Sequence, residues 1–216
     1  MKIHSVKFNF IMNFIMSASS IIFPLITFPY ISRVLMAAGN GKVATASAVL
    51  AYFNMFASLG IPTYGIRACA KVRDDKELLS KTVQELLIIN SVTMLITGVV
   101  YAFSVALVPE FAAEKELYII NGIGLVLNVF AVTWLYNALE QYAYITVVNM
   151  AVKLLSLILM FLLVKNPDDY VLYGGITVLA SSASYVFNFV YATRFITLKK
   201  SGCYDLGRHL KPIFRF

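Results

Sequence analysis

The sequence predicts an all-α protein, a multi-pass membrane bundle of about six transmembrane helices. Hydrophobic residues make up 60% of the 216 residues and charged residues only 13%, and the mean hydropathy is +0.78. Soluble domains have roughly 45–50% apolar and about 25% charged residues, so the composition is that of an integral membrane protein. The apolar residues gather in runs of about 20, the length of a helix that crosses a bilayer. Alternating runs of about ten residues, which are typical of a membrane β-barrel, do not occur.

We expect six spans joined by short connections, so that neighbouring helices are antiparallel. The first run follows Lys2 and Lys7, as a signal peptide would. It is longer than the 7–15 residues of a cleaved apolar region, and we interpret it as the first span. The spans cover residues 8–31, 43–64, 82–108, 117–139, 144–164 and 171–195.

Glycine and proline suggest where the chain turns or bends. Pro24 and Pro29 lie inside the first span, where they free backbone carbonyls and permit a bend. The fragments Gly39-Asn-Gly41 and Gly174-Gly175 are expected to form turns.

The connection at residues 60–81 predicts the orientation of the bundle. It carries five basic residues, Arg67, Lys71, Arg73, Lys76 and Lys81. Short loops rich in Lys and Arg stay on the cytoplasmic side of a membrane. With this loop inside, thirteen basic residues fall on the cytoplasmic side and four on the outer side. We therefore expect both termini in the cytoplasm.

The same residues argue against several classes of function. The net charge of +7 comes from the gaps between apolar runs, so topology explains it and no nucleic-acid partner is expected. Cys69 and Cys203 fall on the reducing side and predict no disulfide. His4 and His209 lie at opposite ends of the chain, and no catalytic set, metal-ligand spacing or phosphate-binding Gly loop is visible. We expect no metal, no cofactor and no enzymatic activity.

Each expected span carries polar residues three or four positions apart, which places them on one helix face. Two explanations stay open. The stripes could hold helices together at about 0.6 kcal/mol per hydrogen bond, or they could converge on a hydrated cavity. Their occurrence on all six spans favours the cavity. The stripes include Asn9, Asn13, Ser17, Ser20, Thr27, Ser47, Asn54, Ser58, Asn90, Thr93, Thr97, Asn121, Asn128, Thr146, Asn149, Lys153, Ser156, Thr177, Ser181, Ser184 and Asn188.

Lys153 is the one full charge near the middle of an expected span, since Glu85 and Arg194 lie near span ends. A lysine near the centre of a membrane helix costs about 2.5–3.5 kcal/mol on insertion scales. It either contacts a substrate in a wet cavity or extends along its own stem to the interface. Arg33 and Arg67 lie near span ends, where anchoring at the interface is the default.

Several motifs of this sequence are similar to those of a known family. They are Phe28-Pro-Tyr-Ile-Ser-Arg-Val-Leu35, Gly41-Lys-Val, Tyr52-Phe53, Leu59-Gly-Ile-Pro-Thr-Tyr-Gly-Ile-Arg-Ala-Cys-Ala70, Trp134-Leu-Tyr-Asn-Ala-Leu-Glu140 and Lys165-Asn-Pro-Asp-Asp-Tyr170. They resemble the N-terminal half of Wzx-type polysaccharide-repeat (O-antigen) flippases. The stretch Met36-Ala-Ala-Gly-Asn-Gly41 departs from the Leu-Gly-Pro-Glu that the family usually has there.

The resemblance implies a member of the multidrug/oligosaccharidyl-lipid/polysaccharide exporter superfamily, whose proteins have two six-helix lobes around a central cavity. Residues 1–216 would form the N-terminal lobe, with the C-terminal lobe absent. The implied activity is the flipping of an undecaprenyl-pyrophosphate-linked oligosaccharide across the bacterial cell membrane. Cationic side chains would meet the pyrophosphate and amides would meet the sugars. The implied substrate-binding residues are Lys153, Arg33, Arg67, Asn13, Asn54 and Asn128.

The resemblance also implies partners, namely the lipid-linked oligosaccharide, the lipid bilayer, a polysaccharide polymerase and glycosyltransferases. Three alternatives stay open. A drug/cation antiporter of the same superfamily would carry an acidic site at mid-span, and none is visible. A membrane-embedded glycolipid transferase would need an acidic or histidine site at the interface, for which Glu140 alone is available. The third is an inactive, truncated lobe.

Overall fold

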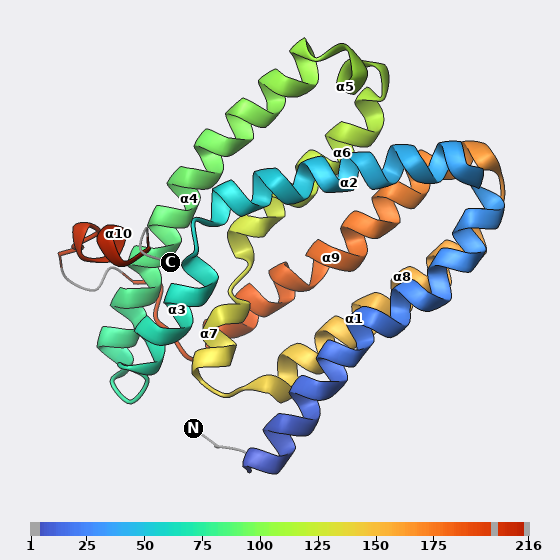
Figure 1. Ribbon diagram of the computed structural model, residues 1–216. Coiled ribbons are helices and arrows are strands. Elements are labelled where there is room, and N and C mark those ends of the chain that lie inside the picture. Colours follow the sequence, from blue (N-terminus) through green and yellow to red (C-terminus); the bar gives the residue numbers. More distant parts are fainter. Residues whose placement is uncertain (1–4, 200–202, 214–216) are drawn as a thin grey trace.

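Two long helices, α1 and α2, meet at a sharp corner and diverge from it, and the other helices pack behind and beside them (Figure 1). The computed structural model describes residues 5–199 and 203–213, and over these residues it is all-helical, without strands. The expected fold class is thus confirmed. The long helices are α1 (Val6–Val34), α2 (Met36–Ser58), α4 (Lys76–Leu107), α6 (Lys115–Leu127), α8 (Tyr142–Leu163) and α9 (Tyr170–Ala192).

Shorter helices join these long ones or cap one end of the bundle. Among the described residues, five helical segments are long and apolar enough to cross a membrane, or six if the bent pair α2 and α3 is one span. The short helices are α3 (Ile61–Ala70), α5 (Pro109–Ala113), α7 (Thr133–Ala138), α10 (Gly207–Ile213) and the 3₁₀ helices η1 (Asn128–Phe130) and η2 (Pro167–Asp169).

The expected second span, residues 43–64, is instead two helices that meet at 41°. Leu59 and Gly60 have φ angles of 43° and 72°, so both lie in the left-handed region and end α2. Glycine enters this region without steric cost, and Pro62 suits the first turn of the next helix. α3 therefore turns away from α2 and runs on to Ala70, beyond the expected boundary.

The fourth expected span corresponds to one candidate span, Lys115–Ala138, but it is not one regular helix. Residues 117–139 were expected to form one helix, but α6 ends at Leu127, η1 follows, and α7 starts only at Thr133. Ala131 and Val132 lie outside the helices, where the backbone loses the regular ladder of hydrogen bonds.

The glycine fragments are not turns. Gly39, Asn40 and Gly41 lie inside α2, which begins at Met36 directly after the corner. Gly174 and Gly175 lie inside α9. A Cβ at Gly174 would clash with Leu117 of α6, so this glycine permits close packing of two helices and does not reverse the chain.

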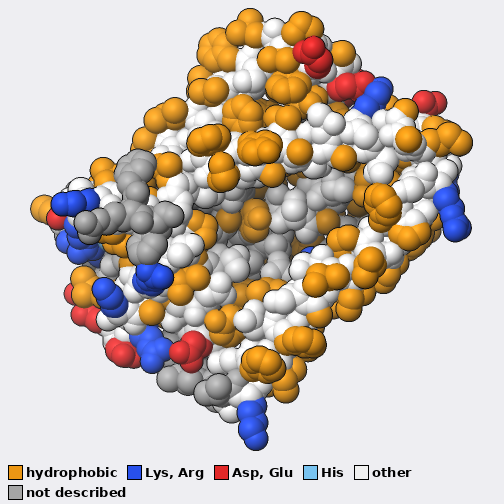
Figure 2. Space-filling view, in the orientation of Figure 1, with side chains coloured by type: hydrophobic (Ala, Val, Ile, Leu, Met, Phe, Trp, Pro, Cys, Tyr) orange, Lys and Arg blue, Asp and Glu red, His pale blue; other side chains and the backbone are white. Residues whose placement is uncertain are grey.

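The packing order places α9 at the centre of the lobe. It contacts α8 on one side and α6 on the other, while α1 packs on α8 and α4 packs on α2 and α6. α1 is an edge helix, because only 6% of its most apolar 18-residue stretch is buried. Figure 2 shows the surface hollowed between α1 and α2, where the two helices diverge.

The outer surface is apolar, as expected of helices that face lipid. Large apolar side chains that are at least 60% exposed lie on several helices, among them Phe10, Phe14, Leu25, Phe28, Leu95, Phe103, Leu107 and Leu162. Lys and Arg side chains gather at the end of the bundle where α3 and α10 lie (Figure 2). We call this the basic end, and its basic residues include Arg67, Lys71, Arg73 and Arg208.

The opposite end is held by a small polar cluster near the corner. Lys42 of α2 forms an ion pair with Glu114, and the Tyr170 hydroxyl of α9 donates to the same carboxylate at 2.8 Å. The Lys42 hydrogen bond, opposed by some desolvation, keeps the pKa of Glu114 below its usual value.

Gly65 of α3 generates a stability prediction. A Cβ at this position would lie 2.7 Å from Cε3 of Trp134 on α7, and Trp134 is buried. We expect Gly65→Ala to destabilise the protein by about 1–3 kcal/mol because the added methyl overpacks the contact. Thermal unfolding in detergent, followed by the fluorescence of Trp134, measures it.

Gly98→Ala is the matched control. Gly98 is also helical, and a Cβ there meets nothing within 4 Å. Alanine should leave the unfolding temperature unchanged or raise it, since glycine in a helix interior costs about 0.5–1 kcal/mol relative to alanine. Equal losses in both variants would contradict the role given to the Trp134 contact.

Candidate functional site: a polar pocket between α1, α8 and α9

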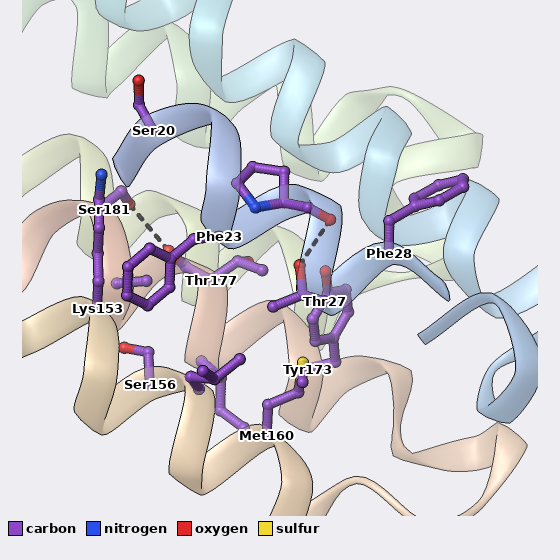
Figure 3. A pocket seen from close by; sticks show the side chains of 14 residues that line it. Ser20, Phe23, Thr27, Phe28, Lys153, Ser156, Met160, Tyr173, Thr177 and Ser181 are labelled. Carbon is purple, nitrogen blue, oxygen red and sulfur yellow. Dashed lines mark hydrogen bonds between the residues drawn. The ribbon is translucent and has the colours of Figure 1, made fainter. Parts of the chain in front are cut away.

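A cavity of about 420 Å³ opens between α1, α8 and α9 (Figure 3). Each of the three helices contributes hydroxyl groups to it, and α8 contributes a lysine. None of the residues that line it is acidic. They are Ser20, Phe23, Pro24, Thr27, Phe28, Lys153, Ser156, Leu157, Met160, Tyr173, Ile176, Thr177, Ala180 and Ser181.

Lys153 is the charged group of this pocket. Its Nζ donates a hydrogen bond to Ser19 Oγ at 2.9 Å and lies 5.8 Å from the centre of the Phe23 ring. Within the described part of the chain, no carboxylate forms an ion pair with it. The hydroxyl of Ser19 is neutral, so the positive charge of the half-buried lysine stays uncompensated.

Two neighbours of Lys153 on the same face of α8 bond to α1. Thr146 Oγ1 donates to the Met12 carbonyl at 3.1 Å, and Asn149 Nδ2 lies 3.7 Å from Met16 Sδ. For these two residues, the polar stripe holds helices together. Farther along the face, Lys153 and Ser156 line the pocket, so one stripe serves both purposes.

Proline shapes the α1 wall of the pocket. α1 continues through Pro24 and Pro29 as one helix. Pro24 has no N–H, so the carbonyl of Ser20 has no helical donor four residues ahead. Both residues line the pocket, and this carbonyl can accept a hydrogen bond from a polar ligand or water.

The other proposed site residues lie elsewhere. Asn128 Nδ2 donates to Asn54 Oδ1 at 2.7 Å, and this pair ties η1 to α2. Asn13 is exposed on α1, and Arg33 is exposed in the last turn of α1 near the corner. Arg67 lines a second cavity, at the basic end. The structure therefore does not bring the six residues together, and their roles stay predictions.

Two residues that contact Lys153 were not singled out from the sequence. Ser19 is 4% exposed and bonds Lys153, but it lies next to the α1 stripe and not on it. Phe23 is one aromatic residue among many in an apolar helix. The contact between Lys153 and Ser19 joins positions 134 residues apart, so no local pattern in the sequence reveals it.

A buried ion cluster was also not anticipated. Glu85 of α4 is fully buried, forms an ion pair with Arg208 of α10 and lies 2.8 Å from Nε2 of His209 on the same helix. Within the described residues, no group of three or more His, Cys, Asp or Glu is arranged to hold a metal ion.

Comparison with known proteins relates this chain to polysaccharide biosynthesis. A family model described as polysaccharide biosynthesis protein matches residues 6–216. A "Putative O-antigen transporter" of Shigella dysenteriae is 27% identical over 165 residues, which are 76% of this chain and 41% of that protein. A protein of the same name from Escherichia coli K12 is 27% identical over 174 residues, 80% of this chain and 41% of that protein. The chain thus spans about two fifths of the length of these curated relatives. No solved structure gave a significant match.

The pocket generates a prediction that separates a functional lysine from a structural one. Lys153→Met removes a half-buried charge whose one bonded partner is a hydroxyl, and we expect it to raise stability in detergent by about 1 kcal/mol. Thermal unfolding measures it.

Thr146→Val is the comparison variant, since it removes a bond of the same stripe to α1. We expect it to lower stability by about 0.6 kcal/mol, the typical worth of an interhelical hydrogen bond in a membrane. A loss in Lys153→Met as large as in Thr146→Val would mean that Lys153 mainly fastens α8 to α1.

Proposed function

Because this chain belongs to the polysaccharide biosynthesis protein family, whose model matches residues 6–216, we propose that it forms the N-terminal lobe of a flippase. The cargo would be an undecaprenyl-pyrophosphate-linked oligosaccharide, turned from the inner to the outer leaflet of the bacterial cell membrane. A C-terminal lobe, absent from this sequence, would complete the transport path. The proposal includes a polysaccharide polymerase and glycosyltransferases as partners and no enzymatic activity.

One observation supports this proposal above the others. The pocket between α1, α8 and α9 contains a lysine with no acidic partner among the described residues. A cation of this kind at membrane depth is costly unless a ligand or water uses it. The ammonium group meets phosphate oxygens as a point charge, and the surrounding hydroxyl groups of Ser20, Thr177 and Ser181 suit a polar cargo.

The walls of the pocket fit the other parts of such a cargo. Phe23, Phe28 and Tyr173 present aromatic surface beside the hydroxyl groups. α1 and α4 expose apolar side chains on their outer sides, so the isoprenoid tail of the cargo would stay in the surrounding lipid. The absence of an acidic residue from the pocket lining disfavours a cation antiporter.

We further propose that the basic end faces the cytoplasm. Arg67 lies there in the last turn of α3, Lys71 and Arg73 lie in the short connection to α4, and Arg208 and Lys211 lie on α10. Basic residues in short loops are retained on the cytoplasmic side. The hollow between α1 and α2 widens away from the corner and toward this end (Figures 1 and 2), so in this conformation it would receive cargo from the inside.

Substitution of Lys153 tests the proposed function. In a complete two-lobed transporter that contains this lobe, Lys153→Ala should reduce export of surface polysaccharide at least tenfold, while abundance in the membrane stays near the wild-type level. Lys153→Arg should retain more activity than Lys153→Gln because it keeps the charge that the pyrophosphate needs. Complementation of a flippase-deficient strain measures export.

Thr177→Val is a useful control, because it removes a hydroxyl that lines the same pocket and bonds the Gly174 carbonyl of its own helix. We expect a smaller loss of export than for Lys153→Ala. If the Lys153→Ala variant complements fully, the cationic site of the transporter is not Lys153, and Arg33 and Arg67 are the next candidates.

Orientation is tested by cysteine labelling in intact cells. In a background where the exposed Cys203 is replaced by serine, a cysteine at Asp75 should resist an impermeant thiol reagent. A cysteine at Asp168 or Glu110 should react, since both positions are exposed at the opposite end.

Permeabilised cells provide the control, in which all three cysteines should react. Labelling of Asp75→Cys in intact cells, together with protection of Asp168→Cys, would reverse the proposed orientation.

A further inference from the structure

A second cavity, of about 650 Å³, lies at the basic end between α3, the start of α4 and α10. None of its residues lines the pocket around Lys153. The lining includes three residues with permanent positive charge, one histidine and no acidic residue. Its members are Tyr64, Arg67, Ala68, Lys71, Val72, Thr82, Arg208, His209 and Pro212.

The α10 wall of this cavity is held in place by the buried carboxylate of Glu85. One Glu85 oxygen pairs with the Arg208 guanidinium and lies 2.8 Å from Nε2 of His209, and the other accepts the backbone N–H of Asp205 at 2.8 Å. On its other side, Nδ1 of His209 lies 2.8 Å from the Tyr64 hydroxyl of α3. The side chain of Arg208 keeps 36% of its surface exposed, so it can still meet a ligand.

The α3 wall brings two more cations to the same cavity. Arg67 and Lys71 are four residues apart and therefore on one face of the helix end. Both are exposed, and no described carboxylate forms an ion pair with Lys71.

Arg73, two residues further along, is different. It does not line this cavity, and it pairs with Glu140 at 3.0 Å. The chain thus neutralises one cation of this connection and leaves another, Lys71, facing the cavity.

Convergence of like charges opposes folding unless an anion offsets it. We propose that this cavity binds the phosphate group of an anionic lipid headgroup at the membrane surface. Arg67, Lys71 and Arg208 would contact the phosphate oxygens, and Glu85 is a positioning residue that holds Arg208. The membrane level fits, because the cavity lies at the basic end, between the end of α3, the start of α4 and α10. Basic pockets between membrane helices recognise phospholipid headgroups in this way.

Such a ligand would link α10 to α3. Arg208 belongs to α10, while Arg67 and Lys71 belong to the end of α3. The bound phosphate would therefore add a contact between segments that are about 140 residues apart and already touch through Tyr64 and His209. The site does not depend on the proposed flippase activity, nor on which side of the membrane the basic end faces.

The test uses the full chain, purified in detergent micelles doped with phosphatidylglycerol, and counts bound lipid by native mass spectrometry. Each basic residue near a charged lipid contributes about a fivefold factor in the binding constant. Lys71→Gln should therefore weaken binding about fivefold, and Arg67→Gln with Lys71→Gln about 30-fold.

Arg73→Gln is the matched control, because it removes the same charge from the same connection but outside the cavity. It should change phosphatidylglycerol binding less than twofold. Phosphatidylcholine binding should be the same in all variants. Fluorescence of Trp134, which contacts α3 at Gly65, checks that each variant is folded.

Inorganic phosphate distinguishes a lipid from a soluble source of the same group. If the lipid is the ligand, millimolar inorganic phosphate will not displace phosphatidylglycerol from the wild-type chain. If inorganic phosphate displaces the lipid from the wild-type chain and Lys71→Gln abolishes this displacement, the cavity binds phosphate but its ligand is the soluble anion and not the lipid. Equal loss of lipid in Arg73→Gln and Lys71→Gln, or no loss in the double variant, would overturn the proposal.

Discussion

The structure depends on one constraint, that hydrocarbon offers no partner to a backbone N–H or carbonyl. The chain meets it with helices, and it breaks those helices only where protein covers the break or a polar space adjoins it. Leu59 and Gly60 end α2 against the packed basic end. The η1 interruption after Leu127 is closed by the amide pair of Asn54 and Asn128. Pro24 frees a carbonyl next to the pocket.

The same constraint divides the polar side chains into two groups. Thr146, Asn149 and the Asn54–Asn128 pair bond across helices, which is worth about 0.6 kcal/mol each. Lys153 cannot be explained in this way, because its insertion costs about 2.5–3.5 kcal/mol and one bond to Ser19 does not offset that. The lysine is therefore the residue for which a ligand or water is the better explanation.

Charge at the basic end also has two roles. As sequence, the cations of residues 60–81 mark an orientation and nothing more. In three dimensions, Glu85 draws Arg208 and His209 onto α4, and α10 then closes a cavity over Arg67 and Lys71. The same basic residues can therefore serve as a topological signal and as a candidate anion site. Orientation depends only on which side of the membrane they lie, whereas a binding site also requires that their side chains come close together.

The sequence alone determined the fold class, a helical bundle of about six membrane spans, and the family, because hydropathy and motif similarity are properties of neighbouring residues. It also singled out Lys153, since a charge inside an apolar run stands out locally. Only the tertiary structure decided that Gly39–Gly41 and Gly174–Gly175 are helical, that the fourth span breaks at Asn128, and that Arg67 and Lys153 belong to different cavities. Each of these depends on a partner far along the chain: Leu117 fits against Gly174, and Glu85 bonds His209 from 124 residues away. Local periodicity carries no information about such partners, because they lie on other helices far along the chain.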